Sequence, residues 1–217
     1  MTDLFTQYFS GQSTVYCRQL WQQYGFGFRV VRPRRSKLGD FRAYPDGRTQ
    51  VTVNADLNPH AFLITYVHEV AHAAVHLAYR KRYQQNRLLG KRTRRPQPHG
   101  TEWQITFNQL MQPLLTESVF PTVVLGPLRQ YMQKPAATTS ANPVLMHALR
   151  QFDDSPLEPV DPSRMLLRDI PEGGSFRLGK KTFVRGTLRR TRVVCKEITS
   201  GSSYAILAHA WVEKSSL

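Results

Sequence analysis

The sequence of 217 residues has few cysteines, few acidic residues and no long hydrophobic run. Its two cysteines, Cys17 and Cys195, are too few for a disulfide scaffold or a four-cysteine zinc ribbon. The longest apolar stretch, residues 61–67, is interrupted by Thr65 and is far below the ~20 residues that span a bilayer. The N-terminus has an early Asp3 and lacks the apolar core of a signal peptide. We therefore expect a cytoplasmic protein in a reducing compartment, without a membrane partner.

Acidic residues are half as numerous as basic ones. The chain has 30 Lys and Arg against 15 Asp and Glu, a formal net charge of +15. Such an excess predicts a polyanionic partner, most often nucleic acid, whereas the alternative is a merely solvated basic surface. A second group of cations occurs within residues 173–217. No zinc finger, helix-turn-helix or RNA-recognition motif is present, so we expect sequence-tolerant, salt-dependent binding.

The hydrophobic pattern predicts both helices and strands, as in an α+β protein. Residues 12–24 have the spacing of an amphipathic helix. Residues 26–54 contain three short strand-like segments, and the turn sequence Pro45-Asp46-Gly47 separates the last two. Three strands in succession favour a small antiparallel meander, and such a one-sided sheet needs a helix packed on its apolar face.

That helix is predicted directly after the strands. Asn58 is a favourable N-cap, Pro59 suits the first helical position, and no glycine or proline occurs from Ala61 to Tyr79. Apolar residues cover most of the circumference, so we expect a buried central helix. A polar side chain on such a helix is costly unless a shared purpose accounts for it.

A basic segment and a second helix follow. Residues 80–98 are rich in Lys and Arg, contain no acid and are expected to be exposed. Thr101 and Gln104 have the spacing of a capping box, which predicts a helix over residues 102–111 with an apolar face.

Composition predicts three parts in the whole chain. Residues 1–125 form the first domain. A proline-rich linker with one short helix at 143–151 is expected over 126–164. Alternating residues predict a small basic β-rich domain of three to five strands over 165–217.

His68, Glu69 and His72 form an H-E-x-x-H sequence within the predicted buried helix. Residues four apart lie on the same face of a helix, about 6 Å apart along its axis, so both imidazoles point the same way. Neutral imidazole is a good Zn²⁺ ligand, and Glu69 is placed to accept a proton from a water on the metal. The motif predicts a zinc site with a catalytic base; the alternative is two core histidines bonded to carbonyls, with Glu69 on the surface.

A catalytic zinc site needs a third protein ligand, and four candidates are His60, His76, His99 and Glu102. His76 continues the four-residue series, but one straight helix does not comfortably present three imidazoles to a single ion, which favours a packing role. His60, in the first helical turn, is expected to be exposed. His99 follows a loop, and a chain reversal at Gly100 would bring its ring towards the other two. Glu102 is a ligand, an orienting group or a first-turn acid favoured by the helix dipole.

The sequence HEVAH at 68–72 followed by HGTEW at 99–103 resembles the SprT-like (Spartan-type) zinc metalloproteases. The resemblance covers roughly residues 1–125. It implies a zincin-like minimal metalloprotease core, made of a helix, a small three-stranded sheet and a buried H-E-x-x-H helix. It also implies that the zinc ligands are His68, His72 and His99 and that the catalytic base is Glu69.

Two features depart from that family. The segment between His72 and His99 is longer and more basic than in its eukaryotic members. The C-terminal cysteine zinc ribbon of many bacterial members is missing, so no second zinc ion is expected. Because eukaryotic members cut proteins attached to DNA, the resemblance implies a zinc-dependent endopeptidase whose partners are protein substrates and DNA. The alternatives are a nucleic-acid-binding protein with a structural or vestigial zinc site, and a zinc hydrolase of a non-peptide substrate.

Overall fold

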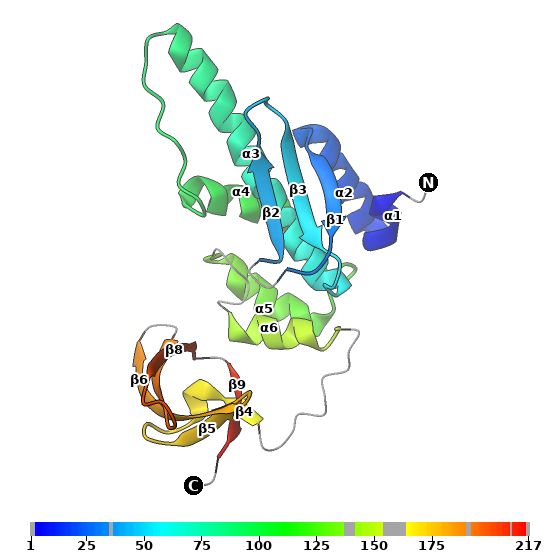
Figure 1. The fold of residues 1–217 in the computed structure, drawn as a ribbon. Coiled ribbons are helices and arrows are strands. Elements are labelled where there is room, and N and C mark those ends of the chain that lie inside the picture. The colour runs from blue at the N-terminus through cyan, green and yellow to red at the C-terminus, as the bar shows by residue number, and fades with distance from the viewer. Residues whose placement is uncertain are drawn as a thin grey trace. The chain divides into compact units, whose positions relative to one another are not determined.

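The computed structural model is a mixed α+β structure, as the sequence predicts (Figure 1). The chain divides into two compact units, Met1–Asp154 and Ser155–Leu217. In its described part it has six α-helices, a three-stranded sheet and a six-stranded sheet, and none of these helices is long and apolar enough to cross a bilayer. The structure describes residues 3–34, 37–136, 142–153, 164–189, 192–208 and 210–215.

Two helices begin the first unit. The side chain of Asp3 accepts a hydrogen bond from the backbone N–H of Phe5 and so starts α1 (Leu4–Tyr8), a helix that the sequence analysis does not anticipate. The predicted amphipathic helix is α2 (Gly11–Tyr24). It ends at Gly25, which adopts the left-handed conformation with a φ of 61° that glycine takes readily at a helix C-terminus.

The three predicted strands are β1 (Gly27–Val31), β2 (Gly39–Ala43) and β3 (Thr49–Asn54). Their order in the sheet is β1-β3-β2, with β1 parallel to β3, so the predicted antiparallel meander is wrong. Only β2 and β3 form a hairpin. The side-chain amide of the buried Asn54 donates to the backbone oxygens of Arg34 and Lys37 and so holds the β1–β2 connection against the end of β3. This topology leaves β2 at one edge of the sheet.

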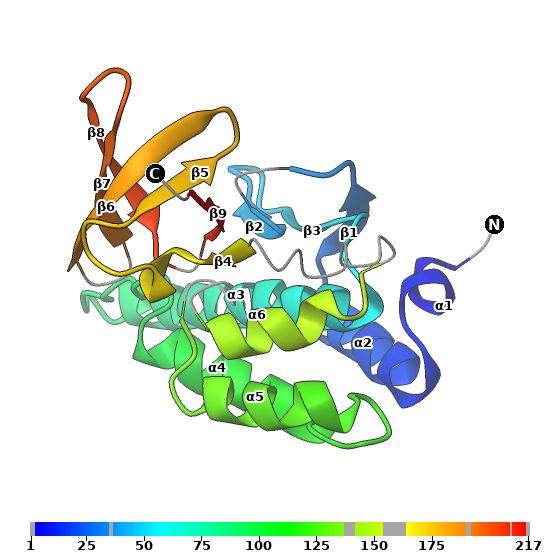
Figure 2. The same ribbon diagram turned by 90° about the horizontal axis from the view of Figure 1, so that it is seen from below.

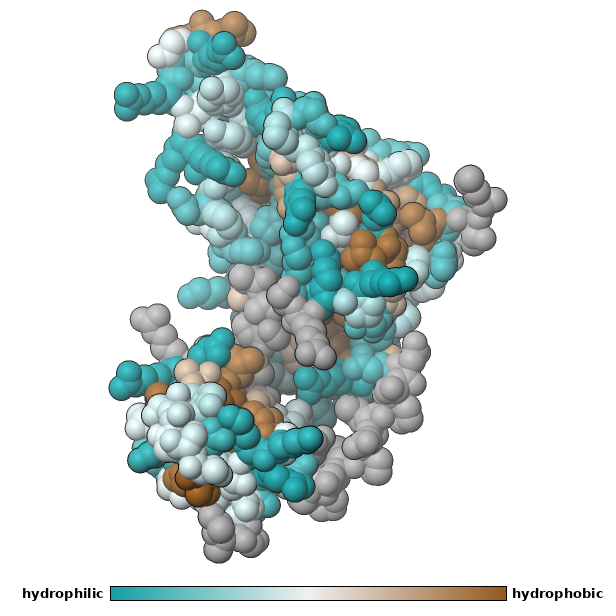
Figure 3. Space-filling view, in the orientation of Figure 1, coloured by the Kyte–Doolittle hydropathy of each residue, from teal (hydrophilic) through white to brown (hydrophobic). Residues whose placement is uncertain are grey.

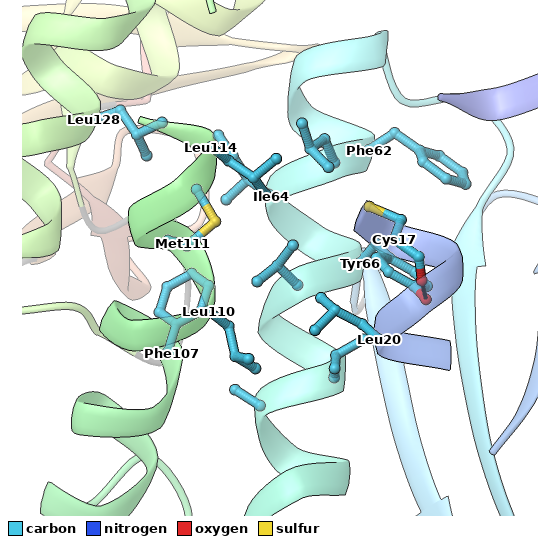
Figure 4. Close-up of a cluster of buried hydrophobic side chains, with 14 of the residues drawn as sticks. Cys17, Leu20, Phe62, Ile64, Tyr66, Phe107, Leu110, Met111, Leu114 and Leu128 are labelled. Atoms are coloured by element: carbon cyan, nitrogen blue, oxygen red, sulfur yellow. Dashed lines mark hydrogen bonds between the residues drawn. The ribbon is translucent and has the colours of Figure 1, made fainter. Parts of the chain in front are cut away.

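The predicted buried helix is α3 (Pro59–Leu88), and it continues beyond Tyr79. The side chain of Asn58 caps it by accepting a hydrogen bond from the backbone N–H of Ala61 at 2.9 Å. The sheet covers one side of α3, while α2 and α4 (Thr101–Met111) cover other sides (Figures 1 and 2). Figure 4 shows side chains from α2 and α4 packed against those of α3, so this helix forms the centre of the hydrophobic core.

The start of α4 differs from the predicted capping box. The helix begins at Thr101 with Gly100 as its N-cap, and no side chain caps it. The amide of Gln104 instead donates to the backbone oxygen of Pro135 at 3.2 Å. The predicted apolar face is present, because Trp103 and Phe107 are both buried. A short 3-10 turn, η1 (Gln112–Leu114), follows the helix.

Two helices lie where the sequence predicts mainly a linker. The short helix expected at 143–151 is present as α6 (Pro143–Arg150), but α5 (Thr122–Met132) is not anticipated. Proline and small residues suggested a linker, yet both helices bury apolar side chains in the core of the first unit and end that unit near residue 154. The remaining linker residues 137–141 and 154–163 lie outside the described residues. The buried side chains are Val124, Leu125, Leu128, Tyr131, Met132, Leu145, Ala148 and Leu149.

The second unit is the β-rich part that the sequence predicts, with six strands instead of three to five. The strand order is β4-β9-β5-β6-β7-β8, every neighbouring pair is antiparallel, and a 3-10 turn, η3 (Leu167–Asp169), follows β4. The unit has its own apolar core, which includes Phe176 and Val193. The strands are β4 (Arg164–Leu166), β5 (Ser175–Leu178), β6 (Lys181–Arg189), β7 (Arg192–Glu197), β8 (Ser203–Leu207) and β9 (Trp211–Lys214).

Candidate metal centre

Three histidine side chains meet in the first unit. His68 and His72 lie one turn apart on α3, and His99 lies in the loop that leads into α4. The Nε2 atom of His99 is 3.1 Å from that of His68 and 3.0 Å from that of His72. The ligand atoms of these three side chains lie within 4.8 Å of one another. Among the described residues, no other group of three or more His, Cys, Asp or Glu side chains is close enough to hold a metal ion. The structure thus brings together the three histidines that the sequence analysis names.

A cation accounts for these contacts better than hydrogen bonding does. The Nε2 atom of His99 carries either one hydrogen or one lone pair in the ring plane, so it cannot form two good hydrogen bonds at once. Zinc with nitrogen ligands at about 2.0–2.1 Å in a tetrahedral site places neighbouring nitrogens about 3.3 Å apart. The observed 3.0 and 3.1 Å are close to that spacing. The donor set of three imidazoles therefore fits a metal ion such as Zn²⁺.

Burial keeps the three imidazoles in the neutral form that binds metals. Desolvation, with smaller effects of the neighbouring rings, lowers the pKa of His68 to about 2. The same causes lower the pKa of His72 to about 4. Burial also lowers the pKa of His99, which is the least enclosed of the three. Near neutral pH the site therefore presents three uncharged nitrogen donors and no positive charge of its own.

An unusual backbone conformation places His99. Its φ of 54° lies in the left-handed region, and it is the only non-glycine residue with a positive φ in the described part of the chain. The backbone N–H of Gly100 donates to the oxygen of Gln97 at 3.0 Å, which closes the expected chain reversal. A left-handed conformation costs a residue with a Cβ about 1–2 kcal/mol, and such strain occurs most often at functional sites.

Trp103 forms the base of the histidine cluster. Its side chain is 1% exposed, and its indole N–H donates to the backbone oxygen of His68 at 3.4 Å. The indole centroid lies 4.6 Å from the ring of His68, 4.7 Å from that of His99 and 5.4 Å from that of His72. The tryptophan thus restricts the orientation of all three rings. Trp103 is part of the HGTEW motif, but the motif alone predicts no role for it at the site.

Glu69 lies beside the histidines and is 6% exposed. Burial, and to a smaller extent the nearby charge of Asp40, raise the pKa of its carboxyl to about 8. A hydrogen bond from the backbone of Phe41 and the positive charges of Arg34 and Lys37 act in the opposite direction. A carboxyl group with a pKa near neutrality can both accept and return a proton, which is what a general base in hydrolysis requires.

A cleft of about 640 Å³ opens in front of the cluster. Residues 39–41 of β2 line one side and residues 95–98 line the other. The edge strand approaches Glu69 so closely that a Cβ on Gly39 would lie 2.7 Å from its Cγ and Oε1 atoms. Only glycine at position 39 allows this approach without displacement, so the backbone of β2 lies directly beside the carboxyl group.

The other candidate ligands lie outside the cluster. His76 lines the cleft, but its ring packs on a phenylalanine of β2, with 5.5 Å between ring centroids. Glu102 is about half exposed in the first turn of α4 and forms an ion pair with Arg82 at 3.1 Å, so it is not a ligand. The ring of His60 packs against that of Phe152 with 4.7 Å between centroids and is half-buried rather than exposed.

The two cysteines do not belong to the candidate metal centre. Both are free thiols with fully buried side chains, and burial raises the pKa of each. A protonated, enclosed thiol is a poor metal ligand and a poor nucleophile. They act as small apolar residues in the cores of the two units.

Comparison of the chain with protein-family models, curated proteins and solved structures gives no match. The site itself combines three neutral imidazoles, a buried carboxyl group and an open cleft.

Proposed function

We propose that the chain is a zinc-dependent endopeptidase of the SprT-like type that acts on DNA-associated proteins. The observation that carries the proposal is the convergence of His68, His72 and His99 beside the buried Glu69, at the end of an open cleft. In this proposal α2, the three-stranded sheet and α3 would make up the zincin-like core that the resemblance implies.

The donor set favours zinc among the common metals. Three imidazoles form a typical catalytic zinc site, which leaves a fourth position for water or substrate. When bound, Zn²⁺ supplies Lewis-acid polarisation of a carbonyl oxygen and lowers the pKa of water towards neutrality. The three histidines hold the ion, and Trp103 keeps their rings in position.

Glu69 is the general base of the proposed reaction. Its carboxylate accepts a proton from the water that attacks the peptide carbonyl carbon, and the carboxyl group then delivers that proton to the leaving amine nitrogen. Burial raises the pKa of this carboxyl in the metal-free chain, and the positive charge of a bound Zn²⁺ would favour the carboxylate that accepts the proton. The burial that raises this pKa also excludes competing bulk water from the carboxyl group.

The position of β2 supports a peptide as the substrate. One side of this strand pairs with β3, and its other side is the free edge of the sheet, next to the cleft. An extended peptide is able to pair with such an edge through main-chain hydrogen bonds. Residues 39–41 would then hold the scissile bond close to Glu69 and the histidines.

The second candidate is a nucleic-acid-binding protein whose metal site is structural, and the net charge of +15 favours it. A structural zinc ion has four protein ligands, whereas the described residues place three around this site. A buried carboxyl group next to the ligands also has no use in a purely structural site. We therefore favour the enzyme.

Metal analysis combined with proteolysis tests the proposal. Wild-type protein is expected to contain one zinc ion per chain and to cleave a basic DNA-binding protein, assayed by gel electrophoresis with and without DNA. Glu69→Gln is expected to keep the zinc ion and to lose activity by about a hundredfold or more, because it removes the general base. A chelator is expected to abolish cleavage, and added Zn²⁺ to restore it.

Glu117→Gln is the matched control, because Glu117 is exposed and lies outside the cleft. It removes the same charge by the same chemical change and should retain full activity. Equal cleavage by wild type and Glu69→Gln would contradict the proposed enzyme, and so would full activity without any metal ion.

A further inference from the structure

A basic arm projects from the first unit, made of the end of α3 and the segment that returns to α4, residues 79–98 (Figure 1). Eight of its residues are Lys or Arg and none is acidic. Its surface is mostly hydrophilic (Figure 3). Only the base of the arm, Tyr79 and residues 95–98, lines the cleft of the histidines, so most of these charges have no role in the proposed peptidase chemistry.

The return segment is held against the helix. The side-chain amide of Asn86 donates to the hydroxyl of Thr93 at 3.0 Å, and the backbone N–H of Lys91 donates to the oxygen of Asn86 at 2.8 Å. Gly90 makes the reversal with a φ of 65°. These bonds give the cations of the arm a defined arrangement, as binding to a defined ligand requires.

A second cleft of about 490 Å³ lies between α3 and the return segment. Arg82, Arg92, Arg94 and Arg95 line it, and its only acidic residue is Glu102, which pairs with Arg82. In the described part of the chain, Arg92, Arg94 and Arg95 have neither an ion pair nor a side-chain hydrogen bond to protein. Three exposed guanidinium groups without a partner around one concavity form a site for an anion with several acceptor oxygens.

Two aromatic side chains lie on the helix that carries Arg82 and Asn86 of this cleft. Tyr79 and Tyr83 are one turn apart on α3, with 6.0 Å between ring centroids, and Tyr83 is 46% exposed. Tyr83 precedes the cleft residue Asn86 by three positions, which places both on the same side of the helix. A groove of arginines with an exposed aromatic ring on the same helix is the combination that binds single-stranded nucleic acid, because phosphates pair with the cations and a base stacks on the ring.

We propose that the arm binds single-stranded nucleic acid, with phosphates in the arginine cleft and a base on Tyr83. A planar anionic membrane fits less well, because it cannot enter a concave cleft between two segments of chain. Arg95 lines both this cleft and the cleft of the histidines. The bound strand would therefore lie beside the metal centre, which extends the proposed function by naming the surface that presents a DNA-associated substrate.

Fluorescence anisotropy with a labelled oligothymidylate of about twenty nucleotides tests this proposal, since one such binding site covers about 4–16 nucleotides. The variant Arg92→Ala/Arg94→Ala/Arg95→Ala should weaken binding by about tenfold or more. It should also lower the slope of log affinity against log salt by about two, because each phosphate contact to a single strand contributes about 0.7.

A triple variant elsewhere on the first unit is the matched control. Arg29→Ala/Arg48→Ala/Lys134→Ala removes the same three charges from exposed residues outside the arm, and we expect it to weaken binding less than threefold. Tyr83→Ala should weaken binding to the single strand by about fivefold or more, because a stacked base is lost, and Tyr83→Phe should restore it.

Equal losses in the two triple variants would overturn the proposal, because they would mean that only net charge matters. Tighter binding to mixed phosphatidylcholine–phosphatidylserine vesicles than to the oligonucleotide would overturn it in favour of a membrane surface. The binding assay needs no protein substrate and no cleavage, and Glu117→Gln, which removes an exposed charge outside both clefts, should give wild-type affinity. Failure of the peptidase assay therefore leaves this result intact, and failure of binding leaves the peptidase assay intact.

Discussion

At the level of single residues, three polar side chains on α3 are buried or half-buried among apolar neighbours at a cost in folding free energy. His68, Glu69 and His72 lie on a helix whose neighbouring residues, such as Val67 and Val70, are fully buried. Each polar group pays for leaving water, and the resulting pKa shifts are all towards the neutral form. A bound cation would offset the cost of burying these three side chains. The free energy of unfolding of the metal-free protein should therefore include that cost in full.

The pH dependence of stability isolates the cost of burying Glu69. In the metal-free protein its folded-state pKa is about 8, above the ordinary value of 4.5 that applies to the unfolded chain. From pH 4.5 to 8 the folded state therefore binds more protons than the unfolded state, and the free energy of unfolding falls by up to about 1.4 kcal/mol per pH unit from this group. We expect metal-free Glu69→Gln to be more stable than metal-free wild type at pH 8, with a difference that shrinks towards pH 5.

Urea unfolding of both proteins between pH 5 and pH 9 measures this difference. The lowered pKa values of His68 and His72 make the unfolded state bind more protons below pH 6.5, so both proteins lose stability on acidification. That contribution is common to the two and cancels in the comparison. The control variant Glu117→Gln should have a free energy of unfolding close to that of wild type, because this residue is exposed. A difference between Glu69→Gln and wild type that does not change with pH would contradict a raised pKa of Glu69.

At the level of elements, the close approach of β2 to α3 depends on one glycine. A Cβ at position 39 would lie 2.7 Å from the Cγ and Oε1 atoms of Glu69 and from the Cγ2 atom of Thr65. Gly39→Ala must therefore displace the strand or the carboxyl group. We expect a loss of about 1–3 kcal/mol in the free energy of unfolding, the usual cost of overpacking, together with a large loss of peptidase activity.

Gly27→Ala on β1 is the matched control for this substitution. A Cβ at Gly27 would lie 3.6 Å from the backbone oxygen of Thr49, an ordinary contact, and Gly27 starts a strand of the same sheet. Urea unfolding and the cleavage assay should show little change for this variant. Wild-type activity in Gly39→Ala would mean that the spacing between β2 and Glu69 does not matter for the reaction.

The elements also show which features the sequence could predict. The α3 helix and its H-E-x-x-H residues follow from local spacing and capping, and they are present where predicted. The position of His99 came from a family resemblance, because a contact between residues 31 apart has no local signal. The sheet order depends on the non-local pairing of β1 with β3, and the roles of Gly39 and Trp103 depend on packing, so none of these could be derived from spacing.

At the level of the whole molecule, each unit has its own hydrophobic core. The core of the first unit extends from Phe5 to Leu149 and includes residues of α5 and α6, while the core of the second unit extends from Leu167 to Val212. The division at Asp154 falls within the predicted linker 126–164, because α5 and α6 are short and contain prolines but bury their apolar faces in the first unit. All of the residues of the candidate metal centre and of the arm belong to the first unit.

Separate cores predict separate unfolding transitions in the intact chain. Leu145→Ala, on α6, and Leu167→Ala, in the second unit, each remove a fully buried leucine side chain, which costs about 2–5 kcal/mol. In differential scanning calorimetry, the first variant should lower the midpoint temperature of only one transition. This should be the transition whose midpoint a zinc chelator also lowers, because α6 shares a core with the candidate metal centre. The second variant should lower only the other transition. If Leu145→Ala left the midpoint temperature of the chelator-sensitive transition unchanged, α6 would contribute nothing to the core around the histidines.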